Sequence, residues 1–416
     1  MLEEKVFKDP VHKYIYVQDQ VIWNLINTRE FQRLRRIRQL GTSFLTFHGA
    51  EHSRFSHSLG VYEITRKIIS QFERNEYDDW PKSERLLCLC AALLHDLGHG
   101  PFSHSLEKVF GTHHEAWSVQ FVLGDTEVNQ VLCSVSEDFP QSVAEVISKS
   151  YQHGIVSSLV SSQLDADRMD YLLRDAYFTG VNYGTFDLER ILRVIRPFQG
   201  HIVVKESGMH AVEDYLMSRY QMYWQVYFHP VTRSAEIILN QIFRRVKWLY
   251  ENSYEFRFMP EQIRNLCEQR LSVQDYVKLD ESIMQTAISF WLNEQDTILV
   301  DLCDRFIHRK LLKYIVIEQP QEQLLAQVYS IVEQAGFDSS YYVHRDYSSD
   351  RTYDIYQPGK SDEKTPILLL NEKAGRLMEI STQSKIVNSI SGIHEGKHYI
   401  YFPEECWQRV NKEGIC

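Results

Sequence analysis

The most informative stretch of this chain is Leu93-Leu94-His95-Asp96-Leu97-Gly98-His99-Gly100. It closes the apolar run Leu86–Leu94, which predicts a buried helix, and its two glycines predict a helix stop followed by a tight loop. Neighbouring side chains on a helix diverge by roughly 100°. His95 and Asp96 can therefore reach one ion only beside a helix end, where this pattern places them. A buried ion pair that stabilises the helix end is the alternative interpretation.

Histidines are concentrated around this stretch, because eight of the 17 lie between residues 48 and 114. An imidazole is costly to bury without a partner, so packing alone explains this density poorly. His57, in the first turns of one expected helix, and Asp167, on another, can join His95 and Asp96. Four ligands from three helices leave positions open for water and substrate. Mixed nitrogen and oxygen ligation suits Mn, Mg, Fe or Zn and does not choose among them.

Apolar periodicity over the whole chain predicts a mainly α fold with a small α+β region at the C-terminal side. We expect three units: a core over residues 1–235, a helical extension over 236–335, and a small α+β region over 336–416 that contacts another subunit. Helices are expected over residues 19–39, 58–72, 84–97, 102–110, 114–123, 142–149, 157–177, 209–227, 231–249 and 272–333. A short strand or a hairpin is expected over residues 6–16, and strands are expected over residues 341–347, 367–371, 376–381 and 398–403.

Composition limits the classes of protein to consider. An apolar content of 44% allows a sizeable core. Neither a signal peptide nor a membrane span is visible, and the seven cysteines are scattered, so we expect a cytoplasmic protein in a reducing compartment. The net charge of −11 makes nucleic acid an unlikely partner, because binding its backbone needs a surplus of Lys and Arg.

Several further motifs extend the pattern in order along the chain. They are Phe31-Gln-Arg-Leu-Arg, Gln39-Leu-Gly, Arg54-Phe-Ser-His-Ser-Leu-Gly, His95-Asp-Leu-Gly-His-Gly-Pro-Phe-Ser-His and Asp165-Ala-Asp-Arg-Met-Asp-Tyr. Together they resemble the HD-domain deoxynucleoside triphosphate (dNTP) triphosphohydrolases, a family that includes the animal SAM- and HD-domain dNTPase and bacterial relatives. The resemblance implies an HD-domain helical core over residues 1–235. It also implies metal-dependent hydrolysis of a dNTP to the deoxynucleoside and inorganic triphosphate.

The resemblance also implies roles for individual residues in catalysis. His57, His95, Asp96 and Asp167 match the metal ligands. His104 matches the histidine near the leaving 5′ oxygen, and His114 with Glu115 matches a His-Glu pair that supports the chemistry. A histidine is the natural proton donor to an alkoxide leaving group, and we predict that His104 fills this role.

Substrate contacts are implied in the same way. A triphosphate carries about four negative charges, and Arg54, Arg168 and Arg219 match the cations that bind it. Gln39 matches the residue that hydrogen-bonds the 3′-hydroxyl, and Tyr227 matches the ring under the deoxyribose, where a 2′-hydroxyl would not fit. The remaining implied substrate contacts are His99, Tyr171, Asp175 and His229.

Regulation by a nucleotide is implied by the N-terminal segment. Lys5-Val-Phe-Lys-Asp-Pro resembles the segment that binds an activating nucleotide between subunits, and Gln32 and Arg35 match residues that hold its base and phosphates. Asn27 occurs where some members read guanine with Asp. Because an amide cannot accept two N–H bonds as a carboxylate does, guanine selectivity does not follow. We expect a homo-oligomer, a tetramer, with nucleotide-dependent activity.

Two other functions fit parts of this pattern. An HD phosphohydrolase acting on nucleoside monophosphates or cyclic dinucleotides is one, although the set Gln39, Arg219 and Tyr227 argues against it. A nucleotide-sensing protein with a vestigial HD site is the other, although a competent residue stands at every ligand position. For Tyr223 and Tyr227 themselves, an aromatic stripe packed against the core is the structural alternative.

Overall fold

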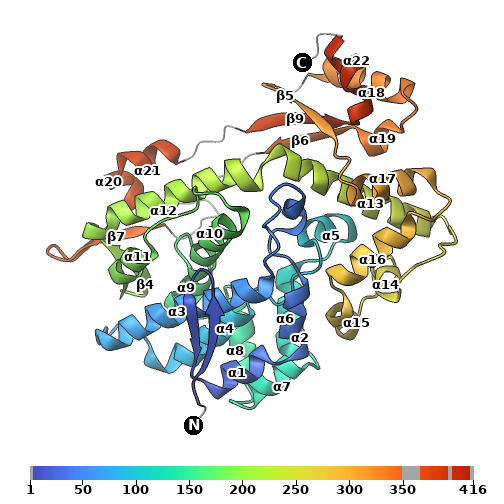
Figure 1. Cartoon of the computed structure of the whole chain (residues 1–416). Helices are drawn as coiled ribbons and strands as arrows, with labels where there is room; N and C mark the ends of the chain where they lie inside the picture. The colour runs from blue at the N-terminus through green and yellow to red at the C-terminus, as the bar shows by residue number, and fades with distance from the viewer. Residues whose placement is uncertain (1–2, 320, 349–365, 392–395, 413–416) are drawn as a thin grey trace.

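Helices form most of the protein, as predicted, and the short strands make three small sheets in the part of the chain that the structure describes (Figure 1). This computed structural model describes residues 3–319, 321–348, 366–391 and 396–412. The chain opens with the expected hairpin, formed by β1 (Lys5–Asp9) and β2 (Lys13–Val17). None of the helices in the described ranges has the length and apolar character that crossing a membrane requires.

The centre of the molecule is built on the helix that the apolar run predicted. In α4 (Arg85–Leu94) every side chain from Leu87 to Leu94 is buried. The long helix α3 (Arg54–Arg74) packs beside α4 on one side and beside α10 (Ala166–Thr179) on the other. The helices α8 (Phe139–Ile147) and α9 (Gly154–Val160) pack against α4, and α11 (Leu188–Val194) packs against α3. Outside them, α6 (His114–Leu123) and α7 (Glu127–Cys133) pack against α8, and α5 (Ser103–Phe110) packs against α13 (Pro230–Glu251).

Two stretches that were predicted as single helices are divided by a capping residue. The stretch 19–39 forms α1 (Gln20–Ile26), α2 (Arg29–Arg33) and the 3-10 turn η1 (Leu34–Arg36). Thr28 starts α2, because its side chain accepts a hydrogen bond from the Phe31 amide. In the stretch 157–177, Asp165 accepts from the Arg168 amide and starts α10 separately from α9. The predictions missed both breaks because the apolar pattern continues across them.

The stretch 209–227 is helical but changes its winding. The helix α12 (Met209–Met222) passes into a π-helical turn, η5 (Tyr223–Tyr227). Pro230 then begins α13 (Pro230–Glu251), and a proline fits a first helical turn because its missing N–H has no partner there. Wider winding at η5 alters the directions in which Tyr223 and Tyr227 point, and π-helical turns are common at functional sites.

The prediction of helix throughout 272–333 was wrong at one place. The helices α15 (Val273–Lys278), α16 (Glu281–Trp291), α17 (Thr297–Ile307) and α18 (Glu322–Gln334) are interrupted by the strand β5 (Lys313–Ile317). This Lys-Tyr-Ile-Val-Ile segment is rich in β-branched and aromatic residues. It pairs with β9 (Lys397–Phe402), which also pairs with β6 (His344–Ser348), all antiparallel.

A second sheet contains a hairpin that the predictions lacked, β3 (Ile195–Phe198) and β4 (His201–Lys205). The strand β7 (Leu368–Asn371) pairs parallel with β4 and antiparallel with β8 (Arg376–Glu379). The C-terminal residues are thus shared between two sheets, and the division into three units stays a prediction. The remaining elements are η2 (Gly41–Leu45), η3 (Lys82–Glu84), η4 (Glu206–Gly208), α14 (Glu261–Cys267), α19 (Ser339–Tyr342), α20 (Ile380–Gln383), α21 (Lys385–Ile390), η6 (Glu404–Cys406) and α22 (Trp407–Lys412).

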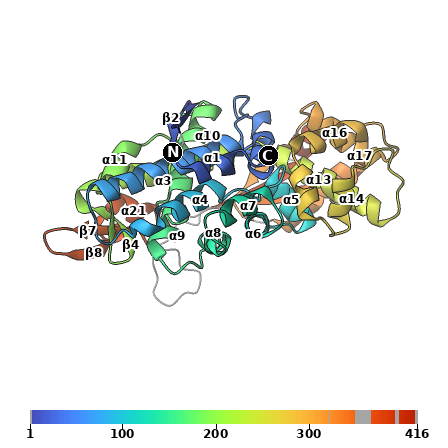
Figure 2. The ribbon, with the colours of Figure 1, turned by 90° about the horizontal axis from the view of Figure 1, so that it is seen from below.

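The second view shows an elongated molecule. In Figure 2, α14, α16 and α17 lie at one end and α11, β7 and β8 at the other, with α3, α4 and α10 between the two ends. The predicted metal ligands all come from these middle helices or from the loop that follows α4. The candidate site therefore lies in the middle of the molecule, among α3, α4 and α10.

Candidate metal centre and active site

Three predicted metal ligands from different helices meet at one point. His57 comes from α3, His95 follows the last residue of α4, and Asp167 lies in the first turn of α10. Asp167 Oδ1 lies 3.1 Å from His57 Nε2 and 3.6 Å from His95 Nε2. The ligand atoms of the three residues all lie within 4.8 Å of one another. The convergence that the sequence predicted is present.

Asp96 lies beside this group. Its carboxylate oxygens are 3.3 Å from His95 Nε2 and 3.7 Å from His57 Nε2. One of them also accepts a hydrogen bond from Arg54. Burial raises the pKa of Asp96, but the charges of His95, His99 and Arg54 outweigh burial and hold it well below its usual range. Asp96 is therefore a carboxylate at neutral pH, as a metal ligand must be.

Hydrogen bonds behind the two histidines orient them for a cation. His95 Nδ1 lies 2.8 Å from the Ala92 carbonyl oxygen, and His57 Nδ1 lies 2.8 Å from Asp170 Oδ2. Such partners fix the ring tautomer and leave Nε2 as the ligand atom. Among the described residues, His95 Nε2 is buried and has no hydrogen-bond partner. This orphaned nitrogen, next to carboxylate oxygens, fits a divalent metal ion.

The predictions missed the residues that hold His57 in place. Asp170 is fully buried, and its oxygens lie 2.6 Å from His12 Nε2 and 2.8 Å from Arg174 Nε, in addition to the bond with His57. Arg174 also bonds Asp9, in the N-terminal hairpin. Burial raises the pKa of Asp170, but Arg174 and the two imidazoles outweigh it and hold the pKa well below its usual range. The only signal in the sequence was the polar spacing of Asp167, Asp170 and Arg174 on one helix.

A second cluster joins His99, Glu107 and His114. The rings of His99 and His114 stack with their centroids 3.9 Å apart, and His114 Nδ1 lies 2.7 Å from Glu107 Oε1. His99 Nε2 lies 3.3 Å from Asp96 Oδ1, which connects the cluster to the candidate metal centre. Burial, followed by the charge of Arg54, lowers the pKa of His99 to about 3, so this imidazole is neutral at pH 7.

The structure does not bring Glu115 to this cluster. Its side chain is 62% exposed and pairs with Lys149 at 3.3 Å. Because successive residues of a helix point in directions roughly 100° apart, Glu115 cannot face the same way as His114 in α6. The carboxylate beside His114 is Glu107 instead, on α5. The sequence patterns did not indicate a role for Glu107.

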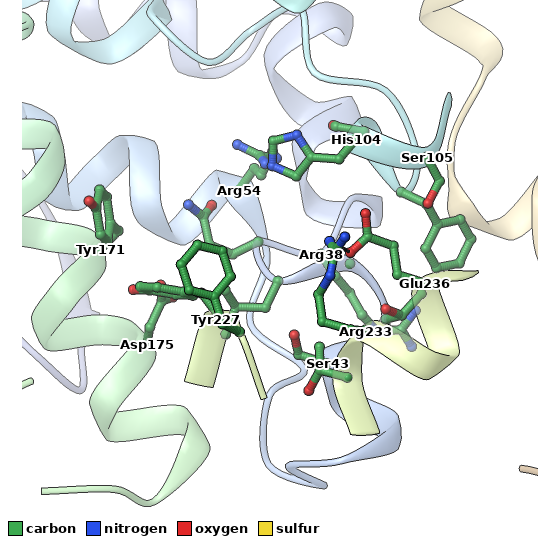
Figure 3. Close-up of a pocket in the computed structure, with 18 of the residues that line it drawn as sticks. Arg38, Ser43, Arg54, His104, Ser105, Tyr171, Asp175, Tyr227, Arg233 and Glu236 are labelled. Atoms are coloured by element: carbon green, nitrogen blue, oxygen red, sulfur yellow. Dashed lines mark hydrogen bonds and ion pairs between the residues drawn. The ribbon is translucent and has the colours of Figure 1, made fainter. Parts of the chain in front are cut away.

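A cavity of about 490 Å³ adjoins the candidate metal centre through Arg54, which lines the cavity and bonds Asp96. Figure 3 shows Arg54 and His104 close together on one side of it, with Tyr171, Asp175 and Tyr227 on another. Six predicted catalytic or substrate residues line it: Gln39, Arg54, His104, Tyr171, Asp175 and Tyr227. Lining residues that the predictions missed include Arg38, Ser43, Thr232, Arg233 and Glu236.

Tyr227 is held in the cavity wall by a chain of hydrogen bonds. Its hydroxyl donates to Asp175 Oδ2 at 2.8 Å, and the other oxygen of Asp175 lies 2.7 Å from His52 Nε2. Tyr223 and Tyr171 pack edge-on against Tyr227 and also line the cavity. The alternative of an aromatic stripe used only for core packing therefore does not describe Tyr223 and Tyr227.

The three arginines predicted to bind a triphosphate share an unusual feature. Each guanidinium of Arg54, Arg168 and Arg219 has a buried Nε atom without a hydrogen-bond partner among the described residues. Arg168 bonds Asp165, and Arg219 lies 5.6 Å from the centroid of Tyr223. A buried unpaired donor costs about 1–3 kcal/mol, more when charged. Such donors point to an anionic ligand, although only Arg54 is among the residues that line the cavity.

The other predicted residues lie away from the cavity. His229 caps α13, with its Nδ1 accepting from the Val231 amide at 3.3 Å. Lys5 pairs with Glu3 on the exposed hairpin, and Asn27 ends α1. Gln32 and Arg35 contact each other at 2.8 Å near that helix end, and Arg35 lies over the Phe55 ring. The structure thus joins Gln32 and Arg35 but does not place His229 against the cavity.

Comparison with known proteins gives the family. The HD domain model matches residues 54–175, and the model of the HD associated region matches residues 186–414, more than half of the chain. This chain belongs to the HD-domain family. Its HD segment begins at Arg54 and ends at Asp175, both of which line the cavity. HD domains bind divalent metals, and the group His57, His95 and Asp167 in this HD protein can hold one.

Relatives of this HD protein range from close to distant. It is 59% identical to the uncharacterized protein YwfO of Bacillus subtilis over 97% of this chain and 93% of that protein. It is 29% identical to the deoxynucleoside triphosphate triphosphohydrolase SAMHD1 of Danio rerio, over 58% of this chain but only 44% of that protein. The crystal structure of a phosphohydrolase from Bacteroides thetaiotaomicron matches with a TM-score of 0.85 at 27% identity, covering 97% of this chain and 100% of that one.

Proposed function

We propose that this HD protein hydrolyses dNTPs to the deoxynucleoside and inorganic triphosphate. The observation that carries the proposal is Arg54, which bonds Asp96 of the candidate metal centre and has a buried Nε without a partner among the described residues, a feature that Arg168 and Arg219 share. An anion with several charges offers acceptors for donors of this kind. The similarity to SAMHD1, whose name states this reaction, supports the same substrate class.

His57, His95, Asp96 and Asp167 would hold the metal, whose charge would polarise a phosphoryl oxygen and lower the pKa of bound water. The protein side chains orient the substrate around this point. Arg54 reaches both Asp96 and the cavity, so it can hold the phosphate nearest the reacting bond. Gln39 Oε1 is buried without a partner among the described residues, which leaves it free to accept from the 3′-hydroxyl.

His104 is the proton donor in this proposal. It lines the cavity, and burial together with the charge of Arg54 lowers its pKa. A bound triphosphate neutralises Arg54 and adds negative charge, which raises the pKa of His104 again. Substrate binding therefore favours the protonated form of His104, which can then protonate the leaving 5′ oxygen.

Product analysis tests the proposal. The full chain is incubated with each dNTP, singly and in mixtures, with Mn or Mg, and the products are identified. We expect inorganic triphosphate and deoxynucleoside, and no turnover by His95→Ala or Asp96→Ala with an unchanged helical circular dichroism spectrum. Release of orthophosphate in place of inorganic triphosphate would contradict the proposal, as would full activity in either variant.

We further propose regulation and assembly for this function. Gln32 and Arg35, together with Lys5 and Asn27, are proposed to bind an activating nucleotide in a tetramer. The contact between Gln32 and Arg35 on an exposed surface supports this grouping. A cytoplasmic location is also proposed, since all six cysteines in the described residues are free. Analytical ultracentrifugation with and without added dNTPs tests the assembly, and a monomer under both conditions would contradict it.

A further inference from the structure

A second cavity, of about 580 Å³, lies where α5, α13 and β6 meet (Figure 1). We infer that this cavity binds a nucleotide through its phosphates. It is lined by basic side chains from all three elements, and its volume falls in the range of small-molecule sites. None of the site residues that were predicted from the sequence lines this cavity. The inference does not depend on the proposed function, because it concerns binding at a different place.

Positive charge is in excess in this cavity, although the chain as a whole is acidic. Lys108, Arg244, Lys247 and Arg345 line it. Within the described residues, Lys108, Arg244 and Lys247 take part in no ion pair with a carboxylate. Lys247 donates to the Val109 carbonyl at 3.2 Å and Arg244 to Gln241 at 2.9 Å, while Arg345 pairs with Glu322. Uncompensated cations in a concave site attract phosphate groups.

The carboxylates of the cavity do not cancel this charge. Asp346 lies on its wall but is engaged by both nitrogens of the Arg233 fork, at 2.8 and 2.9 Å. Glu251 also lines the cavity, but its single negative charge is fewer than the three positive charges of Lys108, Arg244 and Lys247. Burial is the main cause that lowers the pKa of His344 to about 4, and the charges of Arg244 and Lys108 lower it as well.

A second observation points to a ligand with hydrogen-bond donors. Asn240 lines the cavity and is 6% exposed, and its Oδ1 has no partner in the described part of the chain. A fully ionised phosphate offers acceptors only, whereas a sugar hydroxyl or a base amino group can donate to this oxygen. Trp248 lines the same cavity and is 46% exposed; the Arg245 guanidinium lies over its ring, 4.4 Å from the centroid, and the exposed part of the indole is accessible to a base. A nucleotide supplies phosphates, donors and an aromatic face together.

The cavity is connected to the candidate active site. Arg233 lines both cavities, and Lys108 lies one helical turn after His104 on α5. A ligand bound to Lys108 therefore contacts the helix that carries the proposed proton donor. A nucleotide bound in the second cavity can therefore change the position of His104 and Arg233 in the first cavity.

Hydrogen–deuterium exchange of the full chain with ATP, in EDTA to prevent turnover, tests the inference. We expect ATP to protect residues 240–251 and 344–348. The variant Arg244→Gln/Lys247→Gln should bind ATP at this cavity about tenfold more weakly or worse, because it loses two charge-assisted contacts. The matched control Arg74→Gln/Lys82→Gln makes the same charge change at two exposed positions and should leave this protection unchanged.

A second variant separates the nucleoside from the phosphates. Asn240→Ala should weaken the binding of ATP but leave the affinity for inorganic pyrophosphate unchanged. A melting curve verifies that this variant is folded. Unaltered ATP affinity in Arg244→Gln/Lys247→Gln, or protection confined to η2, α10 and η5, overturns the inference. Equal affinity for pyrophosphate and ATP overturns the assignment to a nucleotide. Failure to hydrolyse dNTPs bears only on the proposed function, since these measurements record binding without turnover.

Discussion

Asp170 is the residue that connects the N-terminal hairpin to the candidate metal centre. It accepts hydrogen bonds from His12 and Arg174, and it faces the nitrogen of His57 that is turned away from the cation position. An asparagine there has one acceptor oxygen and one donor nitrogen, so it cannot satisfy three donors. Partners of this kind fix the ring orientation of a ligand histidine.

We predict that Asp170→Asn weakens metal binding by about 10- to 100-fold, which is the usual effect of losing such a partner. Titration with Mn against a competing chelator measures the affinity. Asp78→Asn, at an exposed loop position, makes the same chemical change and should bind the metal like the unaltered chain. Unchanged affinity in Asp170→Asn would show that His57 is held in place by packing alone.

Two glutamates near His114 give a sharper residue-level comparison. Glu107 bonds the His114 ring, whereas Glu115 is exposed and pairs with Lys149. Burial raises the pKa of Glu107, but the hydrogen bonds from His114 together with the charges of His114 and His99 outweigh burial and lower the pKa overall, so Glu107 is charged at neutral pH. A charged carboxylate orients the imidazole beside it.

We therefore predict that Glu107→Gln lowers kcat for dNTP hydrolysis by about 100-fold, since positioned acid–base groups contribute at least that much. Glu115→Gln should stay within about twofold of the unaltered chain, because a surface ion pair contributes little. Steady-state release of inorganic triphosphate measures both variants. An equal loss of kcat in the two variants would show that Glu115 supports the chemistry, as the sequence resemblance implied.

At the scale of elements, the sequence predicted what depends on local pattern and missed what depends on distant partners. Residues 103–110 and 114–123 are helices within one residue of the prediction, and His95-Asp96 stands at a helix end as expected. The strand β5 was missed because it is stabilised by β9, some 80 residues later. His12 was missed for the same reason, since its partner Asp170 is 158 residues away. Ligands that are adjacent in the sequence, such as His95 and Asp96, form a recognisable local motif, whereas partners that are far apart in the sequence do not.

The π-helical turn η5 sets the position of Tyr227, and this leads to a prediction about the sugar. Its ring lines the cavity while its hydroxyl bonds Asp175. We predict that Tyr227→Ala reduces discrimination against ribonucleotides by about 10- to 200-fold, the usual effect of enlarging a close-fitting pocket. Tyr227→Phe keeps the ring and should keep most of the discrimination. The ratio of kcat/KM for dATP to that for ATP measures both, and identical ratios in the two variants would refute a steric role for the ring.

At the scale of the whole molecule, the candidate metal centre joins segments that are far apart in sequence. His57, His95 and Asp167 belong to α3, the end of α4 and α10, and Asp170 extends the connection to the N-terminal hairpin through His12. In the unfolded chain these ligands are dispersed, so a metal ion binds the folded state far more tightly. Any such ligand stabilises the fold by mass action.

Metal removal should therefore lower the thermal stability of the entire chain. At a free metal concentration about 100 times Kd the stabilisation is about 2.7 kcal/mol, and it disappears when EDTA is added. For a chain of this size we expect a fall in Tm of several degrees, measured by calorimetry with Mn and with excess EDTA. His95→Ala removes a ligand and should show the same Tm in both conditions, while Glu115→Gln, which leaves the ligand set intact, should keep the full difference. A metal-dependent Tm that persists in His95→Ala would place the ion elsewhere in the molecule.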